Sequence, residues 1–271
     1  MATEPLIGKI ALIIGATGAI GGALAEELAE RDCTLVLVGR NEKVLKELRN
    51  RLCCVTSDYW QCDISCDKDV SNTYESIINR FGRIDVVIFA AGIGEMMDGF
   101  HFSAQLFEKT IRVNLISLGY WLECIVPHMV QRGQGIIVGI SSLAAGRGLP
   151  RGAAYCPSKA GVSVLFECLR IDLSRLGIHV LLVEPGFIAS RLTTQLPFKP
   201  FIIPAKAAAQ RIVHAIERRR SRIRFPWPIR IYAAVFRLLP RMLFDRVTGP
   251  THPARAPLHD QDPHQAPEPD E

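Results

Sequence analysis

The chain has 271 residues, a net charge of +5 and eight cysteines. This length suits one large α/β domain with a sizeable core, or two small domains. The cysteines follow no disulfide-framework spacing and no signal peptide precedes the apolar run Lys9–Ile14, so we expect reduced thiols and a cytoplasmic protein. Cys53, Cys54, Cys62 and Cys66 lie close in sequence but form no CxxC pair, which argues against a zinc site.

The charge is divided unevenly along the chain. Residues 1–205 carry 20 basic and 20 acidic side chains, whereas residues 206–248 carry 11 basic and two acidic ones. The tail 249–271 has one basic residue against five acids. This asymmetry predicts an acidic partner surface near residues 206–246.

Apolar runs typical of buried parallel strands alternate with helical patterns up to about residue 220. In chain order we expect strands near 9–14, 34–38, 55–60, 84–90, 135–140 and 178–183, and helices near 19–30, 41–52, 67–81, 103–131, 152–176 and 204–220. Six βα units in series predict an α/β fold with a doubly wound parallel sheet (Rossmann fold), in a single domain over residues 1–224. A basic, apolar extension is expected at 225–248, followed by a disordered, acidic tail at 249–271 that contains six prolines.

A glycine-rich turn follows the first strand, where residues 15–21 read Gly-Ala-Thr-Gly-Ala-Ile-Gly. Such a turn lets a dinucleotide pyrophosphate approach the backbone and sit on a helix N-terminus. Plain tight turns can share the pattern, but its position before a βα series favours nucleotide binding. We expect the cofactor to contact Gly15, Thr17, Gly18, Ala19, Ile20 and Gly21.

The second strand ends in Gly39-Arg40. An NAD-specific site has a carboxylate at this place, which binds the ribose 2′-hydroxyl. Here Arg40 could instead pair with a 2′-phosphate. The pattern favours NADP(H), with NAD(H) as the alternative if Arg40 is simply a solvated side chain.

Tyr155 and Lys159 are four residues apart on a predicted helix, so their side chains face the same way, and Ser142 lies thirteen residues before Tyr155. A neighbouring ammonium favours the phenolate, and we expect it to lower the pKa of Tyr155 from about 10. Such a phenol can exchange a proton near neutral pH. Each residue alone has an ordinary structural interpretation, but the three together indicate carbonyl/alcohol redox chemistry.

With these motifs in hand, residues 7–222 resemble the short-chain dehydrogenase/reductase family. The matching motifs, in order, are the turn 15–21, Asp63-Ile64, Ala91-Gly92, Asn114, Ser142, Tyr155-Cys156-Pro157-Ser158-Lys159 and Pro185-Gly186. The resemblance implies that Tyr155 is the general acid/base, that Lys159 tunes it and holds the nicotinamide ribose, and that Ser142 polarises the substrate oxygen. It further implies a relay water at Asn114, adenine contacts at Asp63 and Ile64, cofactor contacts at Ala91 and Gly92, and nicotinamide contacts at Pro185, Gly186 and Ile188.

Two positions depart from the family's pattern. The glycines are spaced GxxGxxG, with Ala19 where the shorter members have glycine. Alanine is small, so we expect binding to persist. Phe89 and Ala90 replace the usual asparagines before Ala91-Gly92, a change that concerns a stabilising hydrogen bond and not the chemistry.

These features predict an NADP(H)-dependent oxidoreductase that interconverts a carbonyl and an alcohol, built as a homo-oligomer (dimer or tetramer). The loop 187–205 is rich in apolar side chains, which favours a lipophilic substrate, although a loop packed on the core would look the same. The alternative function is a catalytically weak NADP(H)-binding scaffold or sensor docked at a membrane or partner protein. The intact Ser–Tyr–Lys set argues against that alternative.

The segment 227–246 is interrupted by four arginines and is too short in apolar residues to span a bilayer. Arg230, Arg237 and Arg241 share one helical face beside Trp227 and other apolar residues, a pattern typical of interfacial helices. Five arginines at 218–224 would add attraction to anionic lipid. We therefore expect peripheral membrane contact through 206–246, with packing on the domain or on a partner subunit as the alternative. No nucleic-acid-binding motif accompanies the charge.

Overall fold

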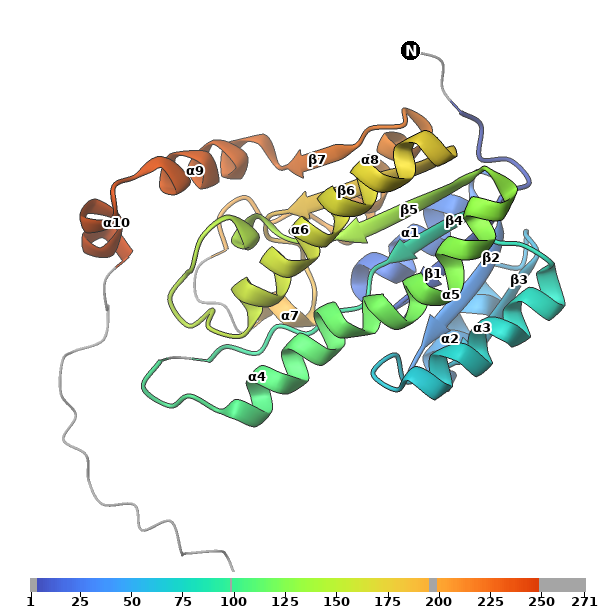
Figure 1. Cartoon of the computed structure of the whole chain (residues 1–271), viewed down its shortest axis with the longest axis horizontal. Helices are drawn as coiled ribbons and strands as arrows, with labels where there is room; N and C mark the ends of the chain where they lie inside the picture. Colours follow the sequence, from blue (N-terminus) through green and yellow to red (C-terminus); the bar gives the residue numbers. More distant parts are fainter. Residues whose placement is uncertain (1–3, 98, 195–198, 249–271) are drawn as a thin grey trace, which may run out of the picture. The chain divides into compact units, whose positions relative to one another are not determined.

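The computed structural model describes residues 4–97, 99–194 and 199–248 (Figure 1). Contacts divide the chain into two units, Met1–Leu238 and Leu239–Glu271. The tail 249–271, for which we predict disorder, lies outside the described residues. The sheet and all the predicted catalytic residues belong to the first unit.

The first unit is built on a seven-stranded sheet in the order β3-β2-β1-β4-β5-β6-β7, and every neighbouring pair is parallel. The strands are β1 (Ile10–Ile14), β2 (Thr34–Gly39), β3 (Ser57–Gln61), β4 (Val86–Phe89), β5 (Gly135–Ile140), β6 (Ile178–Pro185) and β7 (Arg222–Phe225). From β1 the chain adds strands first toward one edge of the sheet and then, from β4, toward the other, and α/β proteins bind nucleotides at such a reversal of strand order. The prediction of a doubly wound parallel sheet is confirmed.

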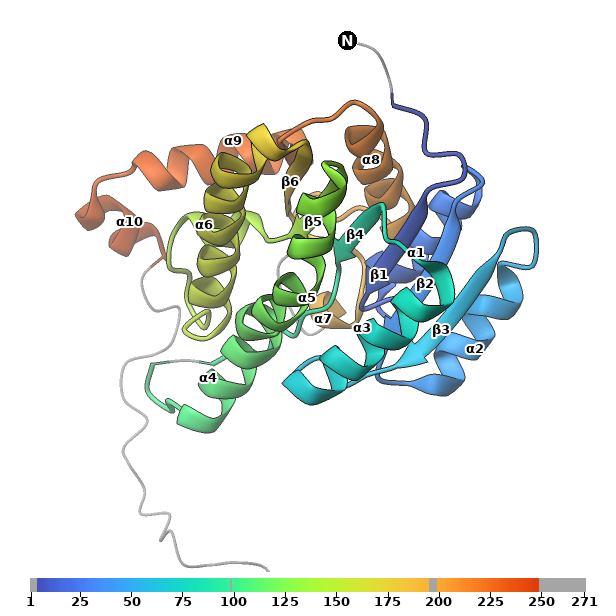
Figure 2. The ribbon, with the colours of Figure 1, turned by 45° about the vertical axis from the view of Figure 1, so that its right-hand side comes forward.

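Helices cover both faces of the sheet, which explains why the central strands are apolar on every residue. One hydrophobic cluster joins the sheet to α1 (Ala19–Ala29), α2 (Glu42–Arg51) and α8 (Ala205–Glu217). A second cluster joins the other face to α3 (Asp67–Phe81), α5 (Ser117–Arg132) and α6 (Tyr155–Leu173). Figure 2 shows α3, α5 and α6 on the near side of the sheet.

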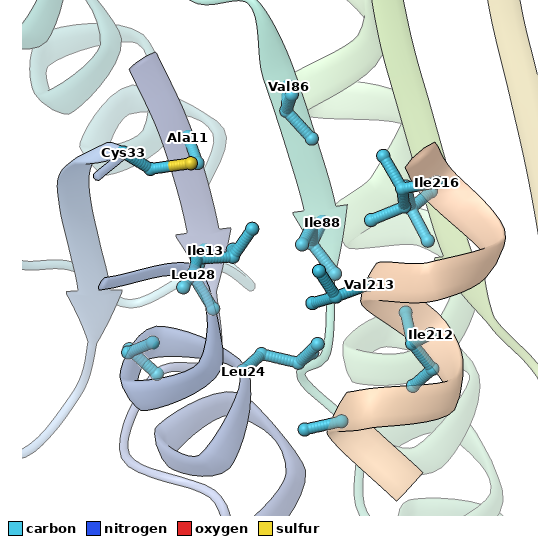
Figure 3. Packing of buried hydrophobic residues seen from close by; sticks show 14 of the residues in the cluster. Ala11, Ile13, Leu24, Leu28, Cys33, Val86, Ile88, Ile212, Val213 and Ile216 are labelled. Atoms are coloured by element: carbon cyan, nitrogen blue, oxygen red, sulfur yellow. The ribbon is translucent and has the colours of Figure 1, made fainter. Parts of the chain in front are cut away.

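The core beneath the nucleotide-binding region is closely packed. Figure 3 shows Leu24 of α1 and Val213 of α8 meeting beside Ile13 and Ile88 of the sheet. All four side chains are fully buried. α1 and α8 pack on this face of the sheet and also contact each other. A helix from near the other end of the domain therefore holds α1, the helix that follows the glycine turn, in place.

The helix expected over 103–131 is divided into three parts. They are α4 (Ala104–Ile111), the π-helical turn η1 (Arg112–Ile116) and α5. Among the described residues, 104–132 is the one helical stretch with the length and mean hydropathy (1.2) of a membrane span. Trp121, Ile125 and Met129 from this stretch pack in the core, and a core helix passes the same test of length and composition.

One strand near the C-terminus, β7, was not expected from the sequence, whereas a helical pattern was expected over 227–246. β7 pairs with β6 and extends the sheet across the domain border that we expected at 224/225. α9 (Trp227–Leu238) follows directly, since Pro228 falls in its first turn, where proline is tolerated. Short turns add η2 (Leu143–Gly146), η3 (Ser174–Leu176) and α7 (Arg191–Thr194), and α10 (Arg241–Thr248) belongs to the second unit.

The arginines at 218–224 are less available to an outside partner than we expected. Arg222 Nε lies 2.5 Å and Arg224 Nε 2.7 Å from the same oxygen, Oε2 of Glu184. Arg219 pairs with Glu4 across the two ends of the domain. Glu184 is buried, so two of these arginines stabilise the sheet edge by neutralising an interior carboxylate.

Candidate active site

The glycine turn between β1 and α1 is shaped by close backbone contacts. Gly15 has φ +93°, and a Cβ at this position would lie 2.4 Å from the backbone nitrogen of Ala91. A Cβ on Gly21 would lie 2.2 Å from the carbonyl oxygen of Gly15. Only glycine fits at either position. The turn is therefore packed directly on Ala91, the residue that follows β4 by two.

The N-terminus of α1 is open. Its N-cap, Gly18, provides no side-chain hydrogen bond, and the first turn has no acidic residue. By contrast, α2 is capped by Asn41, which accepts from the backbone N–H of Val44, and α4 by Ser103. Free N–H groups and the positive end of the helix dipole suit a phosphate, so the turn fits a dinucleotide.

The end of β2 lies against this turn. A Cβ on Gly39 would come within 2.8 Å of Thr17 Cγ2, so the turn covers the strand end closely. Arg40 follows with an exposed side chain, and its backbone oxygen accepts a hydrogen bond of 3.0 Å from Gln61 Nε2. The structure thus places a basic side chain, and no carboxylate, directly after β2.

The residues after β3 have different surroundings from one another. Asp63 is exposed, and its carboxylate accepts the backbone N–H of Ser65 at 3.0 Å. Ile64 is buried in the second hydrophobic cluster. Asp63 is therefore the one of this pair whose side chain is open to a bound ligand.

Ser142, Tyr155 and Lys159 come together at the carboxyl end of β5. Ser142 caps η2, where its hydroxyl accepts the backbone N–H of Ala144 at 3.1 Å, and it shares a hydrogen bond with the Tyr155 hydroxyl. Tyr155 opens α6, and Lys159 lies one turn later. The Lys159 ammonium lies 5.9 Å from the centre of the Tyr155 ring. The predicted grouping of the three residues is therefore present in the structure.

Lys159 is buried, with 6% of its surface exposed, and its ammonium donates to the backbone oxygen of Ile140 at 3.0 Å. Burial lowers the pKa of Lys159 to about 8. Burial also raises the pKa of Tyr155 above its ordinary value, and the hydrogen bond with Ser142 offsets only part of this effect. The expectation that Lys159 lowers the pKa of Tyr155 is wrong for this structure, because desolvation of the phenol is the larger effect.

Asn114 lies in the π-helical turn η1, a kind of local distortion that is frequent at functional sites. Its amide accepts from the Ile93 backbone N–H at 2.8 Å, and donates to the Ile93 oxygen and the Ser158 hydroxyl, both at 2.9 Å. A Cβ on Gly92 would lie 3.3 Å from Lys159 Nζ and 3.4 Å from Asn114 Oδ1. Gly92 therefore leaves the space in which Asn114 and Lys159 approach each other.

Three serines that the sequence did not single out support these residues. Ser141 donates to the backbone oxygen of Lys159 at 2.8 Å and shares a hydrogen bond of the same length with Ser163. Ser158 accepts from Asn114 and donates to the backbone oxygen of Tyr155 at 2.7 Å. All three are buried. The signal available in the sequence was small polar residues at inward positions of an otherwise apolar strand end and helix.

The Pro185-Gly186 turn follows β6 on the same edge of the sheet. The backbone N–H of Gly186 donates to the Phe225 oxygen at 2.7 Å, and a Cβ on Gly186 would lie 3.1 Å from Ile229 Cγ2. Ile188, expected beside the nicotinamide, has its side chain in the first hydrophobic cluster. The side chain of Ile188 therefore anchors the loop on the hydrophobic core.

Two comparisons with known sequences agree with this geometry. A family model described as short chain dehydrogenase matches residues 9–199. An uncharacterized oxidoreductase of Myxococcus xanthus is 31% identical over 240 residues, which cover 88% of this chain and 95% of the relative. A 3-oxoacyl-[acyl-carrier-protein] reductase, FabG, of Rickettsia felis is 33% identical over 191 residues, covering 70% of this chain and 77% of that protein.

Solved structures share the fold. A short-chain dehydrogenase from Streptomyces avermitilis has a TM-score of 0.76 at 21% identity, covering 84% of this chain and 91% of its own. An alcohol dehydrogenase from the archaeon Thermococcus sibiricus, complexed with 5-hydroxy-NADP, has a TM-score of 0.73 at 24% identity, covering 80% and 95%. The sheet order, the open glycine turn and the family match lead to one conclusion. The chain belongs to the short-chain dehydrogenase/reductase family of NAD(P)-dependent oxidoreductases.

Proposed function

We propose that this enzyme uses NADPH to interconvert a carbonyl and an alcohol on a lipophilic substrate. The observation that carries the proposal is the grouping of Ser142, Tyr155 and Lys159 at the carboxyl end of β5. The open N-terminus of α1 lies on the same edge of the sheet. A proton donor for oxygen and a phosphate-binding helix end are the two parts that such a reaction needs.

When bound, the nicotinamide supplies the hydride that reduces the carbonyl carbon. The phenolic hydroxyl of Tyr155 gives its proton to the carbonyl oxygen of the substrate. In the reverse direction, the phenolate takes the proton back from the alcohol. Ser142, hydrogen-bonded to the phenol, is placed to donate to the same substrate oxygen and stabilise the charge that develops there. Lys159 is anchored on the Ile140 oxygen and has further donor protons for the ribose hydroxyls.

Asn114 has a positioning role in this proposal. Its amide makes three hydrogen bonds, two with the Ile93 backbone and one with the Ser158 hydroxyl, which fix the chain around Ile93 and α6 relative to each other. We assign to this turn the relay water that returns protons to Tyr155 through Lys159. The glycine turn 15–21, Ala91 and the Pro185-Gly186 backbone would hold the cofactor from the other side.

The preference for NADP(H) is supported by the surroundings of Arg40. Its exposed side chain follows β2, and the adjacent Gly39 has no room for a carboxylate because Thr17 lies against it. A guanidinium in this place can bind a 2′-phosphate through two hydrogen bonds. Two of the similar solved structures are named with such a cofactor: the Thermococcus sibiricus alcohol dehydrogenase with 5-hydroxy-NADP, and an actinorhodin polyketide ketoreductase with NADPH. Both support this choice.

Apolar side chains around Tyr155 support a lipophilic substrate. A Cβ on Gly94 would lie 3.3 Å from the Tyr155 ring and 3.7 Å from Leu192 Cδ2, so Leu192 borders the catalytic phenol. Phe201 and Ile202, further along the same loop, are exposed. Leu196 and Phe198 lie outside the described residues. The Rickettsia relative, named as a 3-oxoacyl reductase, suggests a ketone on an aliphatic chain.

The proposal is tested by the turnover of ketones of increasing chain length, followed as NADPH oxidation. We expect kcat/KM to rise with chain length. Tyr155→Phe is expected to lower kcat about 100-fold or more, because proton transfer loses its donor, while the affinity for NADPH stays within about twofold. Retention of most of the turnover in Tyr155→Phe would contradict the mechanism. Equal turnover at all chain lengths would contradict the lipophilic substrate.

We further propose a cytoplasmic homo-oligomer, with peripheral membrane contact. An apolar row on α6, Val164 and Ile171, is exposed in the single chain, which supports association of copies through this helix. Light scattering of the purified protein tests this, and Ile171→Glu is expected to give monomers. For the proposed membrane contact we favour α9 over the whole segment 206–246, because Arg219, Arg222 and Arg224 are paired within the fold.

A further inference from the structure

One face of α9 is apolar and exposed. Trp227, Ile231, Val235 and Leu238 have exposed fractions of 70%, 53%, 51% and 84%. Their spacing of four, four and three residues places them on one side of the helix. We call these four residues the α9 ridge. A contiguous apolar row of this kind on the surface of a protein marks a site that a partner or a membrane covers.

The opposite face of α9 is fixed to the domain close to the active site. Ile229 is buried and lies beside Gly186, where a Cβ would come within 3.1 Å of Ile229 Cγ2. Arg147, directly after η2, donates to the backbone oxygen of Phe236 at 2.6 Å. α9 packs against η2 and β7, and η2 is the turn that Ser142 caps (Figure 1). The ridge is therefore held rigidly to the two segments that border the reacting groups.

Charge distinguishes between the surfaces that could cover the ridge. Between Glu217 and Asp245 the chain has eight arginines and no acidic residue. Three of these arginines, Arg219, Arg222 and Arg224, pair with acids within the fold, and the segment still carries an excess of positive charge. Pairing of α9 with α9 of a second copy would bring two such segments together, and the repulsion between like charges makes this unfavourable. An anionic lipid surface would attract them, and Trp, Ile, Val and Leu are suited to its interface.

We propose that the α9 ridge inserts into the interface of an anionic bilayer and holds the active site at the membrane. Resting on the proposed function, the substrate would then be a ketone or alcohol dissolved in the lipid. Because α9 packs on η2, the turn that Ser142 caps, such a substrate would leave the membrane beside the reacting groups. This explains why a helix that closes the fold on one face is apolar on the other.

Sedimentation with vesicles tests the docking surface without any substrate. We expect the full chain to bind vesicles of phosphatidylcholine and phosphatidylserine at about 7:3, and to bind pure phosphatidylcholine less. Ile231→Gln with Val235→Gln should weaken binding about tenfold or more, because two aliphatic side chains no longer enter the interface. Ile7→Gln with Val130→Gln is the matched control, since these side chains are also exposed and lie outside α9. This control should bind as the unmodified chain does.

Tryptophan fluorescence gives a second, local measurement. Of the three tryptophans, Trp121 is fully buried and Trp60 half-buried, so the exposed Trp227 should dominate any change on binding. Vesicles are expected to shift its emission to the blue, and Trp227→Phe should remove the shift. No binding by the full chain, or equal binding by the α9 double variant, would overturn the proposal. The proposal would also be overturned if that variant changed its oligomeric state and still bound vesicles, because the ridge would then be an interface between two copies of the chain.

Turnover separates this inference from the proposed function. The α9 double variant should reduce a short, water-soluble ketone at the unmodified rate, but a long-chain ketone embedded in vesicles at least about tenfold more slowly. If the unmodified enzyme reduces no ketone, the proposed function fails while the vesicle result still decides the docking surface. If the variant reduces the vesicle-embedded ketone, as well as the soluble one, at the rate of the unmodified enzyme, the substrate does not depend on the α9 ridge for its delivery from the membrane.

Discussion

The buried ammonium of Lys159 makes the stability of the enzyme depend on pH. Its pKa is about 8 in the folded chain, against an ordinary value of 10.5. The unfolded chain therefore binds this proton more tightly, and stability rises with pH wherever that is so. Charged Lys159 lowers the free energy of unfolding below about pH 8, and this penalty disappears as the pH rises towards 10.5.

Lys159→Met removes this dependence. Between about pH 7 and about pH 9.5, the free energy of unfolding of the unmodified enzyme should increase by about 2 kcal/mol relative to the variant. Urea unfolding at the two pH values measures the difference, and other titrating groups cancel between the two proteins. Parallel pH dependences would mean that Lys159 is hydrated and keeps an ordinary pKa.

At the same scale, we propose that Arg40 sets the preference for NADPH over NADH. Arg40→Ala is expected to weaken NADPH binding by about 1–3 kcal/mol, the strength of a charge-assisted hydrogen bond, and to leave NADH binding nearly unchanged. Calorimetric titration with both cofactors measures this. The side chain is exposed, so the fold should not suffer. An equal loss for both cofactors would give Arg40 a structural role instead.

The sequence identified the residues to which we assign the chemistry, but not the serines that hold them in place. Tyr155 and Lys159 are related by one helical turn, a spacing that any helix reproduces. Ser141 could not be recognised in the same way, because its partner is a backbone oxygen 18 residues away, brought close by the packing of α6 on β5. The prediction that the pKa of Tyr155 is lowered was wrong for a related reason. Desolvation depends on everything that surrounds the phenol, and spacing describes only one neighbour.

At the scale of elements, β7 depends on Glu184. This carboxylate is buried in β6 and bonded to Arg222 and Arg224 on the neighbouring strand. Burial acts to raise the pKa of Glu184, but hydrogen bonds from the two arginines outweigh it and hold the pKa below its ordinary value. The ion pairs therefore stabilise the fold at neutral pH, and this stabilisation is lost as the pH falls through the folded pKa.

Glu184→Gln leaves the two arginines facing a neutral group. We expect the free energy of unfolding at neutral pH to fall by about 3 kcal/mol, as for other broken buried pairs. Glu167→Gln is the matched control. It pairs with Arg222 at the surface, and its loss should cost less than about 1 kcal/mol. Similar effects of both substitutions would show that burial of Glu184 adds nothing.

The strength of local patterns explains which elements were predicted. Five of the six expected strands are apolar runs, and the ends of all six agree with the structure within two residues. β7 has only four residues, Arg-Ile-Arg-Phe, and their polar–apolar alternation is too short to indicate a strand. It is a strand because Glu184 binds its arginines and β6 offers a free edge. The arginine spacing indicated a helix within 227–246, although the prolines at 226 and 228, which mark a helix start as well as a break, interrupt the apolar residues there.

At the scale of the whole molecule, the end of the first unit predicts where the chain can be shortened. Deleting 239–271 should leave the melting temperature and NADPH binding nearly unchanged, because the first unit ends at Leu238. Deleting 225–271 should unfold or strongly destabilise the protein, since it removes the buried Phe225 and Ile229 and the acceptor for the Gly186 N–H. Thermal melts of both truncations, with and without NADPH, measure this. Equal stability would place the border where the sequence alone suggested, at 224.

The π-helical turn η1 has a consequence for insertions and deletions. A π-turn is an α-helix with one residue too many, so removing any single residue from 112–116 would let α4 and α5 join in one regular helix. Deletion of Leu115 or Ile116 would rotate Asn114 by about 100° relative to α5, away from Ile93 and Ser158. In this stretch a more regular helix would make a less capable enzyme, so the irregular turn is the arrangement that selection for activity would keep.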